Sequence, residues 1–243
     1  MIRTCFLLIM MSMNTIIYSQ SLKSKSANKE FEVNASLNYI SSATIQFSPF
    51  SPDLVQRNLT TDTKGGYGYG VSIRKKFLLE NLYIGLSADY VSITDDGQEA
   101  DYISGKDIIR VRATEKITVI PVEITGYFNT PSFESDLNIY FGGGIGINYG
   151  NRTRKIGNVE SETLEKTPGL NLVVLSGFEY LLEKNVSAFL EFRFRSGQFR
   201  VKGKYPQNSV VIDNFRFPLN NEELNSRIYL DGIKLSLGIA YKF

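Results

Sequence analysis

Strict alternation at the carboxy-terminal end of the chain is the feature that most constrains its fold. From Ile233 to Phe243, apolar residues alternate with charged or small residues. A period of two predicts a β-strand with one apolar face and one polar face. The segment has about ten residues, which is the length that a tilted strand needs to cross the hydrocarbon core of a bilayer. A chain that repeats this pattern is expected to form a membrane barrel.

Segments with the same alternation recur along the rest of the chain. In the clearest one, Leu137, Ile139 and Phe141 alternate with asparagine, tyrosine and glycine. No segment after residue 21 approaches the roughly 18 to 20 continuous apolar residues of a membrane-spanning helix. We therefore expect an all-β chain of about eight strands. The predicted strands cover residues 31–39, 67–74, 84–90, 120–128, 137–149, 170–180, 188–195 and 233–243.

Alternation alone does not identify the face that contacts lipid, because a soluble eight-stranded carrier such as a lipocalin alternates with its apolar face inward. The lengths of the connections favour a membrane barrel. Short turns at one rim and long loops at the other are typical of outer-membrane barrels. The sequence therefore predicts an eight-stranded antiparallel up-and-down transmembrane β-barrel with four surface loops. The short connections lie near residues 79–81, 131–135 and 183–185, and the long ones over 48–66, 94–115, 151–168 and 201–227.

The polar faces of these strands carry too much charge for a dry soluble core. An eight-stranded barrel is just wide enough for side chains to fill its interior. We expect ion pairs to close the interior, and a narrow passive channel for small or hydrophobic solutes is the alternative. The polar faces also include Glu32, Lys76 and Lys242. The predicted charge network consists of Arg74, Asp89, Glu123, Glu179, Glu191, Arg193, Arg195 and Lys234.

Residues 1–21 are predicted to be an export signal, and residues 22–243 the barrel domain. Arg3 supplies a positive start, an apolar run follows from Phe6, and Ser19 and Ser21 are small residues suited to cleavage. A membrane anchor is the alternative, but the apolar run is short and is interrupted by polar residues. Cys5 lies within this segment. The mature chain is therefore expected to have no disulfide and no thiol chemistry.

Histidine is absent from the chain. Ser-His-Asp hydrolysis, histidine general-base catalysis and most zinc sites depend on that residue. We therefore predict a non-enzymatic protein with no catalytic, cofactor-binding or metal-binding residues, and lipid hydrolysis without histidine is a remote alternative. Carboxylates at Asp95, Asp96, Glu99 and Asp101 could hold calcium, but they lack calcium-loop spacing and are expected to form a solvated loop. The net charge of +2 gives no basis for a nucleic-acid partner.

Four segments, in this order and spacing, resemble a known family. They are 120–123 with Tyr127 and Phe128, 139–146, 176–180, and 238–243. The chain resembles the small bacterial outer-membrane β-barrel proteins that include the OmpA-like, opacity-type and PorT-like barrels. The resemblance implies insertion by the barrel-assembly machinery, which in similar proteins reads the final aromatic strand, here with Tyr241 and Phe243. It implies no catalytic residues. Trp is absent, so Tyr and Phe would have to form the aromatic girdle.

The expected surroundings are outer-membrane lipid, with both termini in the periplasm. Arg152, Arg154 and Lys155 are predicted to contact lipopolysaccharide phosphates at the outer rim. The last long connection contains apolar residues such as Val211 and Phe215. Exposed apolar residues there suggest a hairpin that extends the barrel or a surface for a partner. The expected role is envelope structure and surface interaction through the loops.

Overall fold

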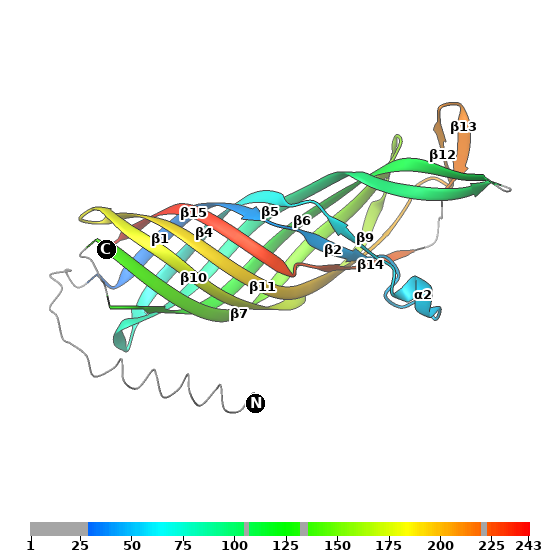
Figure 1. Ribbon diagram of the computed structural model, residues 1–243. Helices are drawn as coiled ribbons and strands as arrows, with labels where there is room; N and C mark the ends of the chain where they lie inside the picture. The colour runs from blue at the N-terminus through cyan, green and yellow to red at the C-terminus, as the bar shows by residue number, and fades with distance from the viewer. Residues whose placement is uncertain (1–28, 105–106, 132–135, 220–222) are drawn as a thin grey trace.

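The computed structural model describes residues 29–104, 107–131, 136–219 and 223–243. Within these ranges the chain is built mainly from antiparallel strands that form an elongated barrel (Figure 1). The short helix α2 (Leu54–Arg57) projects from one end. Among the described residues, no helix has the length and apolar character needed to cross a membrane. The signal predicted at residues 1–21 lies outside the described residues.

Eight strands in the described part of the chain close into a barrel. They are β1 (Phe31–Ile40), β4 (Gly66–Phe77), β5 (Leu79–Ser104), β6 (Asp107–Asn129), β7 (Leu137–Ile156), β10 (Gly169–Glu183), β11 (Val186–Lys204) and β15 (Gly232–Lys242). Their order is β10-β7-β6-β5-β4-β1-β15-β11, and β11 pairs with β10 to complete the ring. The first and last strands pair in antiparallel register, with Leu37 opposite Leu237. The predicted eight-stranded antiparallel barrel is confirmed.

The strands stop at tight turns at one end of the barrel and continue much further at the other. The carboxy-terminus and the tight turns β4–β5 and β10–β11 lie at one end, and several strands run far beyond the other (Figure 1). Short strands continue the wall there. They are β2 (Ala43–Gln46), β3 (Thr60–Thr63), β8 (Val159–Glu160), β9 (Glu162–Thr167) and β14 (Leu224–Tyr229). We call this part the extension.

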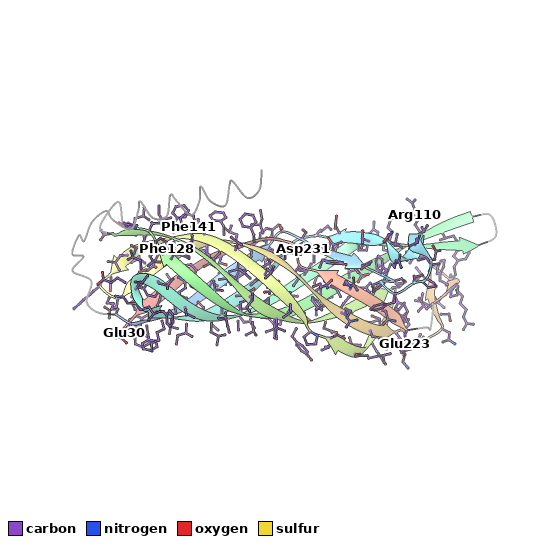
Figure 2. The ribbon with its side chains drawn as sticks, turned by 90° about the horizontal axis from the view of Figure 1, so that it is seen from below. Glu30, Arg110, Phe128, Phe141, Glu223 and Asp231 are labelled. Atoms are coloured by element: carbon purple, nitrogen blue, oxygen red, sulfur yellow. The ribbon has the colours of Figure 1, made fainter. Side chains whose placement is uncertain are left out.

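The predicted long loops are therefore largely strand, which corrects the sequence analysis. Residues 94–104 and 107–115 belong to the β5–β6 hairpin, and residues 151–156 belong to β7. In Figure 2, Phe128 and Phe141 lie near Glu30 at the short-turn end, and Arg110 and Glu223 lie at the far end of the extension. The surface region is thus a continuation of the barrel rather than a set of open loops.

An apolar belt covers the outside of the barrel between the short-turn end and the extension, and we call this part the lower barrel. Leu37, Leu172 and Leu237 point outward and are 73%, 64% and 63% exposed. A soluble carrier would place these side chains inside, whereas a bilayer covers them with acyl chains. The outward apolar face therefore contradicts the lipocalin arrangement for this part of the molecule.

The polarity of the two faces reverses partway along the strands. On β5, Asp89 faces inward and Tyr90 outward, whereas two residues later Val91 faces inward and Ser92 outward. The pairing of β5 continues without a register shift from Val91 to Asp95, so the reversal is in the sequence and not in the backbone. The hydrocarbon must therefore end near Tyr90, because directly beyond it the outer face becomes polar and the inner face becomes apolar.

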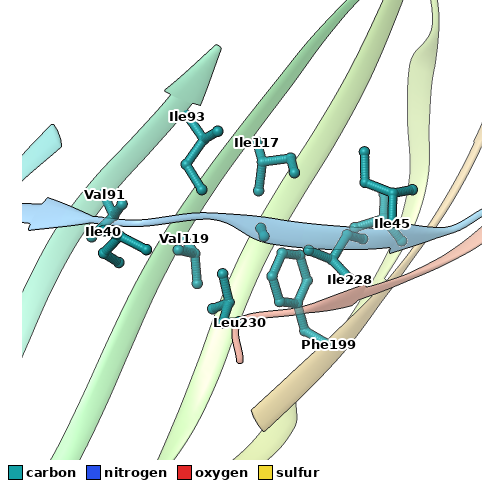
Figure 3. Close-up of a cluster of buried hydrophobic side chains, with 11 residues drawn as sticks. Ile40, Ile45, Val91, Ile93, Ile117, Val119, Phe199, Ile228 and Leu230 are labelled. Carbon is teal, nitrogen blue, oxygen red and sulfur yellow. The ribbon is translucent and has the colours of Figure 1, made fainter. Parts of the chain in front are cut away.

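Buried apolar side chains fill the extension directly above this boundary (Figure 3). They come from several strands and leave their outward neighbours polar, as in a soluble β-barrel. We call this cluster the upper apolar layer. It consists of Ile40, Ala43, Ile45, Val91, Ile93, Ile117, Val119, Phe199, Val201, Ile228 and Leu230.

Aromatic rings mark both edges of the apolar belt. Tyr39 and Tyr67 lie 5.3 Å apart by ring centroids near the boundary, on neighbouring strands. At the other end, the rings of Phe31 and Phe243 stack at 5.9 Å. Amphipathic Tyr rings suit the membrane–water interface, which agrees with a girdle built without Trp.

Candidate functional site

The centre of the barrel interior holds a set of buried ion pairs. Arg193 joins two carboxylates, since its guanidinium lies 2.7 Å from Glu191 and also pairs with Glu123. Glu191 in turn pairs with Arg74 at 3.1 Å. These side chains are almost completely shielded from solvent. Buried charges need partners of this kind, because taking an unpaired charge out of water has a free-energy cost on the order of several kcal/mol.

The set continues toward the upper apolar layer. Arg195 donates a 2.7 Å hydrogen bond from Nε to Glu123 and also pairs with Asp89. Lys234 Nζ lies 2.7 Å from the same Asp89 carboxylate. Asp89 is the last inward charge on β5 before Val91. The ionic part of the interior therefore ends where the upper apolar layer begins.

The set also continues toward the short-turn end. Arg74 Nη1 lies 3.1 Å from Glu32, and Lys242 Nζ lies 3.7 Å from the other oxygen of Glu32. Lys242 also pairs with Glu179. Each predicted network residue therefore lies inside the barrel in an ion pair, and Glu32 and Lys242 join them. The pairs form one sequence of alternating sign, which we call the ion-pair chain. It runs Glu179–Lys242–Glu32–Arg74–Glu191–Arg193–Glu123–Arg195–Asp89–Lys234.

Aromatic rings fill the space around Arg74. Its guanidinium carbon lies 4.1 Å from the ring centroid of Tyr127 and 4.9 Å from that of Tyr140. The Tyr140 hydroxyl donates a 3.2 Å hydrogen bond to Glu191. A cavity of about 20 Å³ remains beside Arg74 and Asp89. Such a volume has room for about one water molecule.

A second buried ion cluster lies in the extension. Arg152 donates two hydrogen bonds to Glu115, of 2.9 and 2.8 Å, and Arg154 Nε lies 3.4 Å from the same carboxylate. Both guanidinium groups stack on Phe47, at 5.0 and 5.2 Å from its ring centroid. The prediction that Arg152 and Arg154 contact lipopolysaccharide is therefore wrong, because both side chains point inward to Glu115. Lys155 is exposed.

Side-chain bonds rather than a backbone ladder join β3 to β5 in the extension. Asp95 accepts hydrogen bonds from the backbone amides of Lys64 and Gly97, at 3.2 and 2.9 Å, and from Gln98 at 2.9 Å. Gln98 also donates to the carbonyl oxygen of Asp62 at 3.1 Å. Burial alone would raise the pKa of Asp95, but these donors and the Lys64 cation together hold it below its usual range. We call this junction the β3–β5 seam.

The predicted acidic loop is therefore part of a wall. Asp95 is buried and fully bonded within the β3–β5 seam, while Asp96 is exposed and lies 3.3 Å from Lys64 Nζ. Among the described residues, no group of three or more acidic side chains is placed to hold a metal ion.

The last connection forms a hairpin at the far end of the extension. Strands β12 (Ser209–Ile212) and β13 (Phe215–Pro218) pair with each other (Figure 1). Val210 and Phe217 are buried against the tip of the β5–β6 hairpin, including Val111. Val211 and Phe215 remain exposed. The structure thus has the predicted hairpin, and it caps the extension.

The predicted insertion residues lie at the opposite end. Tyr241 and Phe243 both point outward, and their rings lie 6.2 Å apart. The backbone of Phe243 also closes the barrel, since it exchanges hydrogen bonds of 2.9 and 3.1 Å with Phe31. An assembly role for this strand end remains a prediction, and the contacts show a structural role beside it.

These features define the class of the protein. The described strands form a closed eight-stranded transmembrane β-barrel with an apolar outer belt and an ionic interior. The chain belongs to the family of the outer membrane protein beta-barrel domain, which matches residues 7–243. It is therefore a multi-pass protein of the bacterial outer membrane.

The first of the following solved structures supports the fold, and the other two are similar to the chain at lower TM-scores. The outer membrane protein OprG from Pseudomonas aeruginosa has 14% identity and a TM-score of 0.57, covering 88% of this chain and 96% of that chain. Neisserial surface protein A has 14% identity and a TM-score of 0.47, covering 88% and 97%. The outer membrane protease OmpT from Escherichia coli has 12% identity and a TM-score of 0.45, covering 93% and 99%. No curated protein matches the sequence.

Proposed function

We propose that the protein is a non-enzymatic barrel that serves envelope structure and surface interaction, and that its interior conducts no solute. The observation that carries this proposal is closure at two levels. The ion-pair chain fills the membrane-spanning interior, and the upper apolar layer fills the extension above it. A dry apolar layer opposes the passage of ions, and a buried salt-bridged layer opposes the passage of apolar solutes.

The extension supports the surface role. Strand β5 runs from the boundary at Ser92 to Ser104. At about 3.3 Å per residue and a tilt of roughly 40°, this length reaches about 30 Å beyond the hydrocarbon. Ordered strands of this length outside the membrane present fixed side chains to the surroundings, unlike open loops. The structure of the extension is thus suited to contact rather than to transport.

Single-channel recordings of the purified protein in planar bilayers test the closed interior. We expect no conductance above the bilayer background for the natural chain. Substitution of Phe199 by Ala should leave it closed, because the ion-pair chain still fills the barrel below. A persistent conductance of the natural chain would contradict the proposal and favour the narrow passive channel instead.

A further inference from the structure

Two arginines face each other on the outside of the extension. Arg200 on β11 and Arg227 on β14 are directly opposed in the antiparallel register. Neither forms an ion pair with any carboxylate in the described part of the chain. The Nε of Arg227 is buried and has no hydrogen-bond partner among the described residues. Arg227 Nη1 donates a 3.3 Å hydrogen bond to the Tyr229 hydroxyl. Like charges that are directly opposed destabilise a sheet, and no carboxylate among the described residues offsets the repulsion of this pair.

An aromatic ring holds the two guanidinium groups side by side. The Phe50 ring centroid lies 5.6 Å from the guanidinium carbon of Arg200 and 5.9 Å from that of Arg227. Phe50 itself is 58% exposed, so the ring serves these cations rather than a core. Stacking on an aromatic ring orients a guanidinium group while its N–H donors stay free. The pair is therefore preorganised for an anion.

Arg200 lines a groove between β9, β11 and β14, and Arg227 lies opposite Arg200 at its side. Its volume is about 360 Å³, and Phe50, Arg200, Thr167 and Asn225 are among the residues that line it. Lys202 lines it as well but is neutralised by Glu165 at 3.6 Å and by Glu223 at 3.2 Å. The groove thus offers one unpaired cationic pair surrounded by hydroxyl, amide and carboxylate groups. This composition suits a polar ligand that carries an anion and several hydroxyl groups.

The groove lies on the flank of the extension, outside the hydrocarbon. On β11 and on β15, which follows β14 in the chain, the last outward apolar residues are Phe194 and Ile233, which pair with each other. Arg200 lies six positions after Phe194 in the chain, and Arg227 lies six positions before Ile233. At about 3.3 Å per residue and a tilt of roughly 40°, they stand about 15 Å above the acyl chains. A side-facing groove at that height lies at the level of the polar headgroups and of what they carry, beyond the acyl chains.

We propose that this groove binds an anionic saccharide, bearing phosphate or carboxylate groups, of the glycolipid in the surrounding outer leaflet. The Arg200 and Arg227 guanidinium groups bind the anion through paired N–H donors, and Thr167 and Asn225 hydrogen-bond sugar hydroxyls. The inference rests on the proposed function in one respect, which is that the extension stands outside the cell. It replaces the lipopolysaccharide contact that was predicted at Arg152 and Arg154.

Titration calorimetry of the folded protein in detergent micelles tests the inference. The probe is deacylated lipopolysaccharide, with neutral dextran oligosaccharide and inorganic phosphate as comparisons. The double variant Arg200→Gln/Arg227→Gln should weaken binding of the probe at least tenfold. The matched control Arg112→Gln/Lys116→Gln removes the same charge from exposed positions on β6 and should change it less than twofold.

Several results would overturn the proposal. Equal affinity of the two double variants would show that the arginine pair does not bind the probe. If dextran bound as tightly as the probe, the anion would not be what the groove recognises. If inorganic phosphate bound as tightly as the probe, the saccharide would contribute nothing to binding. Tighter binding of a heparin tetrasaccharide than of the probe would assign the groove to a polysaccharide from outside the membrane.

The folded state is checked by the heat-dependent gel mobility of each variant. If Arg200→Gln/Arg227→Gln fails to fold, Arg200→Lys/Arg227→Lys keeps the charge and loses only the fork of donors, and it should still weaken binding severalfold. Unchanged binding in that variant would contradict the proposed contacts. A negative result for the groove would not contradict the proposed closed interior, because the single-channel recordings test the interior separately.

Discussion

Asp89 and Val91 lie two residues apart on β5, and both side chains are buried inside the barrel, at 5% and 0% exposure. Asp89 is held by Arg195 and Lys234, whereas Val91 belongs to the upper apolar layer. The inside of the barrel therefore changes from ionic to apolar within one pleat. The outside changes in the opposite sense at the same level, which places the edge of the hydrocarbon there.

The apolar belt predicts that the loss of stability caused by an outward charged substitution depends strongly on its position along the barrel axis. Leu237→Arg places a charge in the middle of the belt and should destabilise the barrel by about 2–4 kcal/mol. Thr94→Arg places the same side chain outward on β5 beyond the boundary, and should change the stability by less than about 0.5 kcal/mol. Urea unfolding in lipid vesicles measures both. Equal losses for the two variants would argue against a belt that ends near Tyr90.

The ion-pair chain predicts a large cost when one carboxylate is neutralised. Glu123→Gln keeps the size of the side chain but leaves Arg193 and Arg195 with less compensating charge, and it should cost about 3–5 kcal/mol. The control is Glu99→Gln, because Glu99 pairs with Arg110 at 3.7 Å on the exposed surface. An exposed pair of this kind contributes about 0–1 kcal/mol. A Glu123→Gln barrel as stable as the control would contradict a coupled chain of buried ions.

The β3–β5 seam predicts a local dependence on pH. The pKa of Asp95 in the folded protein lies below its usual range. The bonds of the Asp95 carboxylate therefore contribute fully above the unfolded pKa of about 3.9, and that contribution is lost as the pH falls through the folded value. Amide exchange of Lys64 and Gly97 should be protected at pH 7 and lose protection in acid.

The variant Asp95→Asn separates this effect from general acid unfolding. It should open the seam at pH 7 by about 1–2 kcal/mol, because a charged acceptor becomes neutral. In acid its exchange should approach that of the natural chain. A constant difference between the two proteins from pH 7 to pH 3 would show that the carboxylate charge is not what holds the seam.

The end of β15 predicts separate effects on assembly and on stability. Phe243→Ala removes the terminal aromatic residue, whereas Phe31→Ala removes only its stacking partner. Both variants should lose similar stability when refolded into detergent, roughly 1 kcal/mol for the ring contact. Only Phe243→Ala should also lower the amount of folded barrel recovered from cells severalfold. Equal recovery of the two variants would show that Phe243 is not part of an insertion signal.

The sequence was sufficient to predict the membrane-spanning part. Period-two alternation fixes the face of each residue, so Glu123 and Arg193 could be placed inside without knowledge of their partners. The pairings themselves were not predictable, because Arg193 contacts a carboxylate that lies 70 positions away in the chain. That proximity follows from strand order around the barrel.

The extension was not predictable for a different reason. Beyond Val91 the alternation continues, but its polarity is reversed, so residues that look like a polar loop form the outer face of a wall. Arg152 was expected to contact lipopolysaccharide phosphates because it stood in a predicted loop, whereas β7 continues through it and directs it to Glu115. The soluble-barrel pattern that alternation left open is present in the extension, above the membrane barrel.

Nitroxide labels at outward positions of β5 would locate the edge of the hydrocarbon along the barrel wall. Labels at Leu86, Tyr90 and Thr94 in lipid vesicles can be compared for collision with lipid-dissolved oxygen and with a water-soluble nickel chelate. The account predicts high oxygen accessibility at Leu86, a change near Tyr90, and access of the nickel chelate at Thr94. Thr94 immersed in lipid, or Leu86 shielded from oxygen, would contradict it.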